Sequence, residues 1–532
     1  MLRIDTIDFG ITRPSCIRQS SLDNDESPVP VPAIARAGFS HPLGSREQSM
    51  TAQYPLYIDG ELITSEKVLH VNNPFDQTVV GSTFFGSAAD LDRATLAAER
   101  AFPAFSRAPV FDRVEILKAL GQQLKTRRTE VIEVIVKEAG KPVGDATVEV
   151  DRGIFTIETA AEEAKRIQGE VIPLDLLPSS KDRMGIVRRF PIGPIAGISP
   201  FNFPLNLALH KVAPAIASGN TIVLKPPTLA PLTMLLVAQM AHDIGLPAGV
   251  LNVLPMDRQT GNAMVEDPRF KMLSFTGSPD VGWDMKARAG MKKVVLELGG
   301  NAGVLIDDDA DLEFAISRIR SGGFGYAGQT CISVQRIFVM EGVYEQVRDG
   351  IVAAALTLKA GDPSDPTTEL GPMIDDKAAN RTQSWVSEAV SQGATLLTGG
   401  KADGLFFEPT VIENAPPESL VCSREAFAPL VVLQAVQTFS DGIRRLNDTA
   451  YGLQAGIFTN RLEHALAAHE RVEAGAVVIN DVPSYRIDHM PYGGVKASGL
   501  GREGIRYTIE DMTEPRLMVI NRLDSQRLDQ VS

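Results

Sequence analysis

The sequence predicts an α/β protein built around a parallel sheet that is buried on both faces. Strand and helix candidates alternate along residues 194–300, and such alternation is typical of a parallel sheet covered by helices. The strand candidates are continuous apolar runs, for example TIVLKP at 221–226, as expected for strands with no solvent-exposed face. With 532 residues, of which 44% are hydrophobic, the chain is long enough for more than one domain with a sizeable core.

The chain begins with a segment, residues 1–49, that mixes charges, Pro and Ser without a periodic apolar pattern. The segment lacks the apolar stretch of a secretory signal, and its acidic residues argue against a transit peptide. Because Met50 opens MTAQYPLYIDGELI, which reads as a natural start, we interpret residues 1–49 as a disordered extension or a misplaced start codon.

The globular pattern begins near Tyr57. The stretch LYIDGELI predicts a hairpin that turns at Asp59–Gly60. Residues 88–168 then predict helices, and the first of these helices has Ser87 or Asp90 available as its cap.

The alternating series comes next. Its expected strands are 194–199, 221–226, 250–255, 271–277 and 292–300, and its expected helices are 205–219, 231–245 and 279–290. Because ligands of such sheets lie beyond the carboxyl ends of the strands, the informative residues are those that end or follow a strand. They are Pro200–Phe203, Lys225, Thr276–Gly282 and Glu297. A second α/β region, from about 300 to 498, opens with the helix ADLEFAISRIR, and the tail YTIEDMTEPRLMVINR has an extended end suited to pairing with another subunit.

The composition excludes several kinds of partner. The formal net charge of −14 and the sequence pI near 5.1 argue against nucleic acid or an anionic membrane as a binding partner. They do not exclude a small basic pocket for a phosphorylated cofactor. No run of about eighteen apolar residues is present, so no membrane span is expected. Cys16, Cys331 and Cys422 are too few and too scattered for a disulfide framework or a metal site, which favours the reducing cytoplasm and no metal.

Cys331 is the first chemical candidate. A lone cysteine is more often a small hydrophobe in the core. However, Cys331 follows a helix with an apolar face and a run of glycines, from Gly322 to Gly328, that allows close approach of the backbone. A thiolate is the strongest nucleophile that a side chain offers near neutral pH, so both interpretations stay open on the local pattern alone.

Three further side chains stand at predicted strand ends. Glu297 is either a surface carboxylate or a general base that activates water. Asn202 either stabilises a turn between prolines or donates to an oxyanion. Lys225 is either solvated or placed to bind ribose hydroxyls or a phosphate. FTGSPDVG at 275–282 opens a helix, whose N-terminus suits a pyrophosphate, although its glycines are a weak fingerprint alone.

Together these residues fall into seven motifs that resemble those of the NAD(P)-dependent aldehyde dehydrogenases, in the family's order. The motifs are SPFNFP, VLKPP, SFTGSPDVG, LELGGN, GQTC, EAFAP and YGGVKASGLGREG. The resemblance covers residues from about 54 to 523. The separation of 34 residues between Glu297 and Cys331, and that of 23 residues between Asn202 and Lys225, are also familiar in the family.

The resemblance implies a mechanism. Cys331 would attack the aldehyde carbonyl to form a thiohemiacetal, and Asn202 with the Cys331 backbone N–H would hold the oxyanion. After hydride transfer, Glu297 would activate the water that hydrolyses the thioester to a carboxylate. The resemblance also implies the cofactor-binding residues, which are Ser199, Pro200, Phe201, Lys225, Thr228, Gly277, Ser278, Gly282, Glu425 and Phe427.

The resemblance implies an α/β architecture in three parts and a homodimer or homotetramer. A Rossmann-like cofactor domain would comprise residues 54–166 and 192–298, and an α/β catalytic domain would comprise residues 299–498. A small β oligomerisation arm would combine residues 167–191 with residues 507–523.

Position 228 bears on the choice of cofactor. Many NAD-preferring members of the family have Glu three residues after the Lys, whereas this chain has Thr228. The change removes a carboxylate that would repel a 2′-phosphate. We therefore expect NADP or NAD as cofactor and expect that NADP is accepted, while a preference for NADP and equal use of the two cofactors both stay open.

The substrate is expected to be a small hydroxylated or anionic aldehyde of the lactaldehyde, succinate semialdehyde or glyceraldehyde-3-phosphate type. Arg486 lies in a loop region where family members acting on acidic aldehydes often use Arg, although a solvated loop Arg is the alternative. Some family members that act on phosphorylated aldehydes carry Arg where this chain has Thr330, and phosphonoacetaldehyde-type enzymes tend to carry His where it has Phe203. These two differences argue against phosphonate specificity.

Two other functions compete with aldehyde oxidation to a carboxylate. The first is a CoA-acylating semialdehyde dehydrogenase, against which Glu297 counts. The second is a non-catalytic protein on the same scaffold, which the joint presence of Cys331, Glu297 and Asn202 disfavours.

Overall fold

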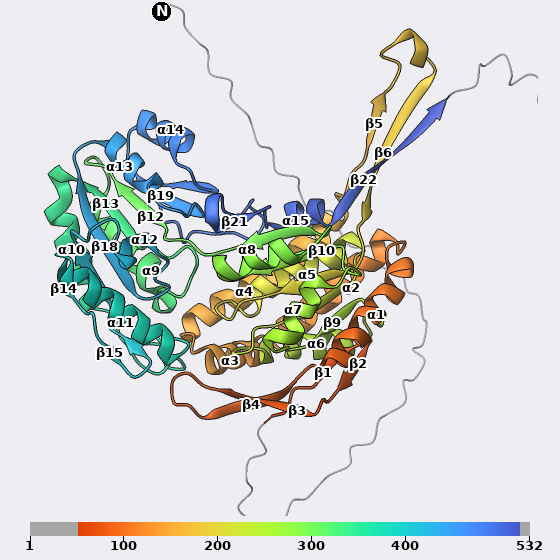
Figure 1. The fold of residues 1–532 in the computed structure, drawn as a ribbon, viewed down its shortest axis with the longest axis horizontal. Helices are drawn as coiled ribbons and strands as arrows, with labels where there is room; N and C mark the ends of the chain where they lie inside the picture. Colours follow the sequence, from red (N-terminus) through yellow and green to blue (C-terminus); the bar gives the residue numbers. More distant parts are fainter. Residues whose placement is uncertain (1–51, 522–532) are drawn as a thin grey trace, which may run out of the picture. The chain divides into compact units, whose positions relative to one another are not determined.

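The computed structural model describes residues 52–521, and the interpretation of residues 1–49 falls outside them. Two large sheets, each covered by helices, form the body, and a three-stranded arm extends from it (Figure 1). The α/β class expected from the sequence is confirmed. Within the described residues, no helix combines the length and the apolar character that crossing a bilayer demands.

The first sheet has eight strands in the order β2-β1-β9-β8-β7-β10-β11-β21. Its strands are β1 (Leu56–Ile58), β2 (Glu61–Ile63), β7 (Ile195–Ile198), β8 (Ile222–Lys225), β9 (Leu251–Val253), β10 (Met272–Thr276), β11 (Lys293–Glu297) and β21 (Gly499–Leu500). Strands β9, β8, β7, β10 and β11 are parallel, as predicted, and β1 with β2 forms the predicted hairpin. Because β7 is flanked by β8 on one side and β10 on the other, the winding reverses there, and a ligand crevice is expected at that point.

Helices cover both faces of the first sheet. They are α1 (Ala88–Phe105), α2 (Val110–Thr126), α3 (Arg128–Ala139), α4 (Val143–Ala164), α5 (Asn206–Ser218), α6 (Leu232–Asp243), α7 (Arg258–Glu266), α8 (Pro279–Arg288) and α15 (Ile505–Asp511). At the start of α1, Ser87 and Asp90 form a capping box in which each side chain accepts from the other residue's backbone N–H. Both predicted cap residues are therefore used.

Helix α7 is the one element of this series that the apolar pattern did not predict. Its sequence, RQTGNAMVE, is mostly polar and short. The helix begins because Asp257 accepts a hydrogen bond from the Thr260 backbone N–H at 2.9 Å. The sequence signal that could have predicted this helix was its capping residue Asp257, because the helix has no apolar periodicity.

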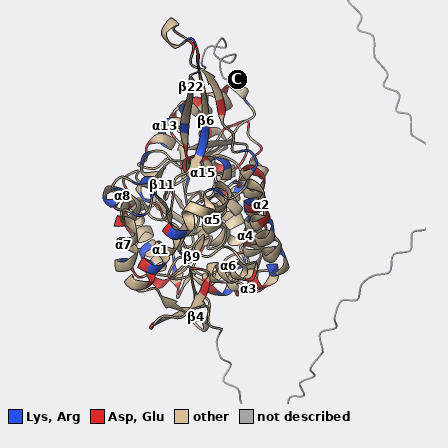
Figure 2. Cartoon of the chain, turned by 90° about the vertical axis from the view of Figure 1, so that its right-hand side faces the viewer, with Lys and Arg blue, Asp and Glu red and all other residues tan. Residues whose placement is uncertain are grey.

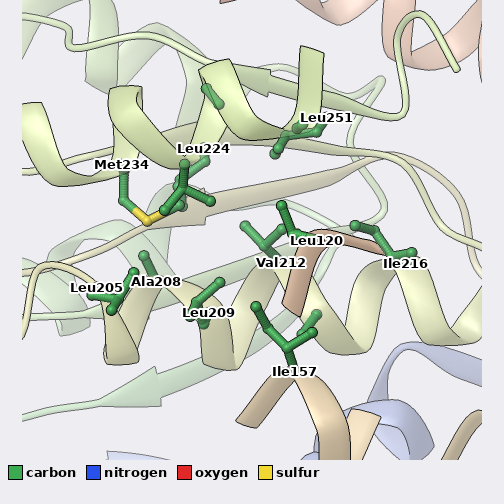
Figure 3. Packing of buried hydrophobic residues seen from close by; sticks show 14 of the residues in the cluster. Leu120, Ile157, Leu205, Ala208, Leu209, Val212, Ile216, Leu224, Met234 and Leu251 are labelled. Carbon is green, nitrogen blue, oxygen red and sulfur yellow. The ribbon is translucent and has the colours of Figure 1, made fainter. Parts of the chain in front are cut away.

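The core of the first sheet centres on α5, all of whose residues are buried. Figure 3 shows Leu209 and Val212 of α5 packed towards Leu120 of α2 and Ile157 of α4, with Leu224 of β8 on another side of the helix. Since α5 begins directly after the SPFNFP loop, its burial fixes that loop at the carboxyl end of β7.

The second sheet has seven strands in the order β14-β17-β18-β13-β12-β19-β20, and all of them except β14 are parallel. The strands are β12 (Gly303–Ile306), β13 (Arg336–Met340), β14 (Thr395–Thr398), β17 (Thr410–Glu413), β18 (Leu430–Val436), β19 (Gln454–Phe458) and β20 (Ala476–Ile479). Its helices are α9 (Leu312–Phe324), α10 (Tyr344–Leu356), α11 (Asp376–Ser391), α12 (Leu420–Ser423), α13 (Phe439–Asn447) and α14 (Leu462–Arg471).

Two small hairpins complete the body. They consist of β3 (Lys67–Asn72) with β4 (Val79–Phe85), and β15 (Ala402–Asp403) with β16 (Phe406–Phe407).

The arm consists of β5 (Glu170–Pro173), β6 (Arg183–Pro191) and β22 (Thr513–Asn521). Strand β22 pairs antiparallel with β6 along its full length, and the two run side by side in both views (Figures 1 and 2). The tail strand thus pairs with its own chain within this subunit. It begins at Thr513, because α15 still holds residues up to Asp511.

Candidate active site

A cavity of about 560 Å³ opens at the carboxyl ends of the first sheet and reaches the second. Among the residues that line it are most of those predicted from the sequence, namely Ser199, Pro200, Phe201, Asn202, Thr228, Gly277, Ser278, Glu297, Cys331, Glu425 and Phe427. Lys225, Gly282 and Arg486 are not among the lining residues. The structure therefore gathers the three expected catalytic side chains and most of the expected cofactor residues around one space.

The Cys331 loop has an unusual backbone. After α9 the chain turns through Tyr326, Ala327 and Gly328, which have φ values of 48°, 52° and 66°. A Cβ at position 328 would lie 2.0 Å from the backbone oxygen of Ala428, so only glycine fits. Left-handed conformations at consecutive non-glycine residues are costly, and such strain is concentrated at functional sites.

Hydrogen bonds hold this loop against both sheets. The Asn202 side-chain amide donates to the backbone oxygen of Gln329 at 2.9 Å. The Gln329 side-chain oxygen accepts from the Ile374 N–H at 2.9 Å. Because an amide NH₂ has two hydrogens, Asn202 retains a second donor in the cavity that Cys331 also lines, as an oxyanion would require.

The Cys331 side chain keeps partial exposure, and its sulfur lies 2.9 Å from the Tyr492 hydroxyl. Burial raises the pKa of the thiol to about 12; the Tyr492 hydrogen bond opposes that rise, and Glu425 adds to it. Tyr492 was not predicted as a site residue, although it begins the motif YGGVKASGLGREG. The signal available in the sequence was a tyrosine hydroxyl directly before two glycines.

Glu297 ends β11, opposite Thr276 of β10. Its side chain is buried, and neither carboxylate oxygen has a hydrogen-bond partner within the described residues 52–521. Burial, with a further contribution from Glu503, raises the pKa of Glu297 well above its ordinary value. A carboxylate in this state is a base without a competing partner, so the interpretation as a surface Glu is wrong.

Glu425 lies on the Gly299–Gly300 backbone. Its carboxylate accepts from the Gly300 N–H at 3.1 Å, and a Cβ on residue 299 would lie 2.0 Å from the same carboxylate. Burial raises the pKa of Glu425 to about 7. The rings of Phe201 and Phe427 meet edge to face, with their centroids 5.9 Å apart. The Glu425 carboxylate and these two rings all line the same cavity.

Lys225 is the last residue of β8 and packs against Gly261 of α7. Burial lowers the pKa of its amine to about 8. Across the part of the chain that the structure describes, the amine makes no hydrogen bond or ion pair. An unpaired ammonium at a strand end has the donors that ribose hydroxyls or a phosphate would use, so this site fits a dinucleotide cofactor.

Lys377 and Arg381 also line the cavity, from α11 of the second sheet. They stand one helical turn apart, and the Arg381 guanidinium donates to the Ala426 backbone oxygen at 2.9 Å. Neither residue was predicted from the sequence, because charged residues four apart on a polar helix are typical of any solvated face.

Arg486 is buried, with 5% of its side chain exposed, so the alternative of a solvated loop residue is wrong. Its guanidinium stacks on the Tyr492 ring, 3.6 Å from the centroid, and approaches the Glu503 carboxylate at 3.3 Å. Its Nε–H has no partner among residues 52–521. Arg486 is therefore separated from the Cys331 sulfur by one aromatic ring and has an unused donor.

Comparisons with known proteins agree with this geometry. A 3-sulfolactaldehyde dehydrogenase from Priestia megaterium is 41% identical over 471 residues, which cover 88% of this chain and 98% of the relative. Aldehyde dehydrogenase 21 from Physcomitrella patens, solved with the reaction product succinate, superimposes with a TM-score of 0.88 at 44% identity, covering 89% of this chain and 99% of that one.

A third similar structure is a glyceraldehyde-3-phosphate dehydrogenase from Methanocaldococcus jannaschii in complex with NADP. It has a TM-score of 0.83 at 38% identity and covers 86% of this chain and 100% of its own. The model of the Aldehyde dehydrogenase family matches residues 62–518. On the seven motifs, the single cavity and these matches, the chain belongs to the aldehyde dehydrogenase family.

Proposed function

We propose that the chain oxidises a small aldehyde to a carboxylate, with Cys331 as the nucleophile. The observation that carries this proposal is the one cavity lined by Cys331, Glu297 and Asn202 together. A nucleophile, a base and an oxyanion donor in one space are the components that acyl chemistry through a thioester requires.

The reaction follows from these groups. The Cys331 thiolate attacks the carbonyl carbon, and the free N–H of the Asn202 amide with the Cys331 backbone N–H stabilises the oxyanion. A bound nicotinamide cofactor supplies the acceptor for the hydride that leaves the thiohemiacetal carbon. Glu297 then takes a proton from water, whose oxygen attacks the thioester carbon, and the carboxylic acid leaves as the sulfur is released.

Most of the residues that hold the cofactor are proposed from their place around the cavity, and Lys225 is proposed from its place at the end of β8. Lys225 binds the adenosine ribose or its phosphate, and Gly277 with Ser278 borders the pyrophosphate at the start of α8. Glu425 and Phe427 contact the nicotinamide ribose and ring. Lys377 and Arg381 add positive charge from the opposite wall.

Replacing Thr228 by Glu is expected to lower kcat/KM for NADP by roughly 10- to 100-fold, while NAD is affected much less. A carboxylate at this position of the cavity would repel a 2′-phosphate. Steady-state kinetics with both cofactors measure the effect, and Thr228→Gln is the matched control because it adds the same bulk without charge. A wild-type enzyme with a large preference for NAD would contradict the proposal.

The proposed substrate is a small hydroxylated or anionic aldehyde. Similar proteins are named for 3-sulfolactaldehyde and for lactaldehyde, and a similar structure holds succinate. Arg486 supports an anionic group, because a buried guanidinium with an unused Nε–H remains under-satisfied until another acceptor arrives. Thr330 and Phe203 do not add a second cation beside Cys331, which disfavours a phosphonate.

Arg486→Lys is expected to raise KM for succinate semialdehyde by roughly 10- to 100-fold, because the ammonium keeps the charge but loses the bidentate fork. The control is butanal, which has the same chain length without the carboxylate. The decisive quantity is the ratio of kcat/KM between the two aldehydes. If this ratio stays at its wild-type value, Arg486 does not recognise the carboxylate.

The overall function is tested with a panel of aldehydes, in which formation of the reduced cofactor is followed with NADP or NAD, and with or without CoA. Turnover that needs no CoA and yields the free acid supports the proposal. Strict dependence on CoA would instead establish the acylating alternative, and no turnover with any member of a broad panel would favour a non-catalytic protein.

We also propose a homodimer or homotetramer assembled through the arm. Leu517, Met518 and Val519 of β22 are each about half exposed, and β20 is an edge strand of the second sheet as far as the described residues show it. Exposed apolar strands and open sheet edges favour pairing with another chain.

The small number of scattered cysteines supports a reducing compartment such as the cytoplasm.

A further inference from the structure

Tyr492 stands in an unusual position for a core tyrosine. Its side chain is 2% exposed, and its ring packs with Ile332 and Leu453. Within the described residues its hydroxyl has a single hydrogen-bonding neighbour, the Cys331 sulfur at 2.9 Å. A buried tyrosine hydroxyl usually has an oxygen or nitrogen partner. Because the partner here is a thiol, the contact points to a role of the hydroxyl in the reactivity of that thiol.

The direction of this hydrogen bond follows from the surroundings. Burial raises the pKa of Tyr492 well above its ordinary value, so the phenol keeps its proton. Once Cys331 loses its proton, the sulfur can only accept, and the phenol is the donor. The remaining charged groups that face the pair are Glu297 and Glu425, which disfavour a thiolate, and Arg486, which favours it.

We propose that Tyr492 is a catalytic residue, whose hydroxyl donates a hydrogen bond to the Cys331 sulfur and stabilises the thiolate that attacks the aldehyde. The proposal rests on the function proposed above, in which Cys331 is the nucleophile. A hydrogen bond to a charged acceptor is shorter and stronger than one between neutral groups. The distance of 2.9 Å is short for a bond to sulfur and places the hydroxyl in direct contact with the reacting atom.

Arg486 strengthens this donor. Its guanidinium lies on the face of the Tyr492 ring, 3.6 Å from the centroid, and Glu503 holds it from the other side. A cation on the face of an aromatic ring draws on the electron density of the ring, which makes the phenol hydrogen more positive. Glu503, Arg486, Tyr492 and Cys331 thus form a continuous path of contacts from a buried ion pair to the nucleophile.

The test measures how fast iodoacetamide alkylates Cys331 as pH changes, without any aldehyde. The thiolate sulfur forms a bond to carbon and iodide leaves, so the rate reports the thiolate fraction. In Tyr492→Phe, the midpoint of the pH dependence should rise by about one to two pH units, and the rate at neutral pH should fall roughly 10- to 100-fold. Mass analysis of the Cys331 peptide separates this reaction from that of Cys422.

The matched control is Tyr344→Phe, which removes a tyrosine hydroxyl of α10 that donates to Glu413 of β17, and neither residue lines the cavity. It should leave the alkylation profile unchanged. A second variant places 3-fluorotyrosine at position 492, where a more acidic phenol is a stronger donor and should lower the midpoint. This substitution keeps the hydroxyl and therefore the packing.

Unchanged midpoints in both Tyr492 variants would overturn the proposal. Failure of the proposed function would look different: Cys331→Ala would continue to oxidise aldehydes, while the alkylation profile of the wild-type thiol would still respond to Tyr492. The two proposals are therefore tested by separate readouts.

Discussion

Cys331→Ala is expected to abolish aldehyde oxidation, with a loss of at least about 1,000-fold in kcat. Among residues 52–521, Cys331 supplies the only thiol that lines the cavity, and no hydroxyl or amine of that lining stands on the same strained loop. Without the sulfur no thiohemiacetal forms, so the hydride has no covalent intermediate from which to leave. The measurement is the rate of formation of the reduced cofactor at saturating aldehyde.

The matched control for this loss is Cys422→Ala. Cys422 is buried in α12, and its thiol makes a long contact, at 3.9 Å, with the Ala415 backbone oxygen. Removal of this thiol should leave kcat within about twofold, because it lies outside the cavity lining. Substantial turnover by Cys331→Ala, or loss of turnover in Cys422→Ala with the fold intact, would contradict the assignment of the nucleophile.

Glu297→Gln is expected to slow steady-state turnover by roughly 100- to 10,000-fold while the first hydride transfer survives. Glutamine keeps the shape of the side chain but cannot accept a proton from water, so the thioester accumulates. Rapid mixing should therefore show a burst of about one reduced cofactor per active site, followed by a very slow phase. Absence of the burst would mean that Glu297 acts before the thioester forms.

The control for this variant is chemical. Hydroxylamine attacks a thioester without a general base, so adding it should restore turnover to Glu297→Gln but not to Cys331→Ala. The wild-type hydrolysis step should also accelerate as pH rises through the elevated pKa of Glu297, because only the carboxylate form is a base. A hydrolysis rate independent of pH would argue against this role.

The sequence predicted the parallel sheet well because its strands are continuous apolar runs that end at distinctive residues. Lys225 and Glu297 each close a buried strand, and parallel strands bring their carboxyl ends to one edge. Their common position at the carboxyl edge of the first sheet thus follows from local patterns. Helix α7 was not predicted, because its mostly polar sequence has no apolar periodicity and a single N-cap residue is a weak signal for a helix.

The environment of the nucleophile was not predictable from the sequence in the same way. The contact between Tyr492 and Cys331 joins residues 161 positions apart, and no local rule brings them together. The burial of Arg486 likewise depends on Glu503 and on the Tyr492 ring, whereas the loop sequence around it is equally typical of solvent. Tertiary packing decides these contacts.

The left-handed turn at Tyr326, Ala327 and Gly328 has a consequence for how such chains change during evolution. We expect its conformational cost to be retained where catalysis requires Cys331 to be held in place, because strained backbone is concentrated at functional sites. A descendant that lost its activity would be free to relax there, and a side chain at position 328 would be among the first signs. The residue at position 328 thus provides a criterion for distinguishing active enzymes from inactive homologues in genome sequences.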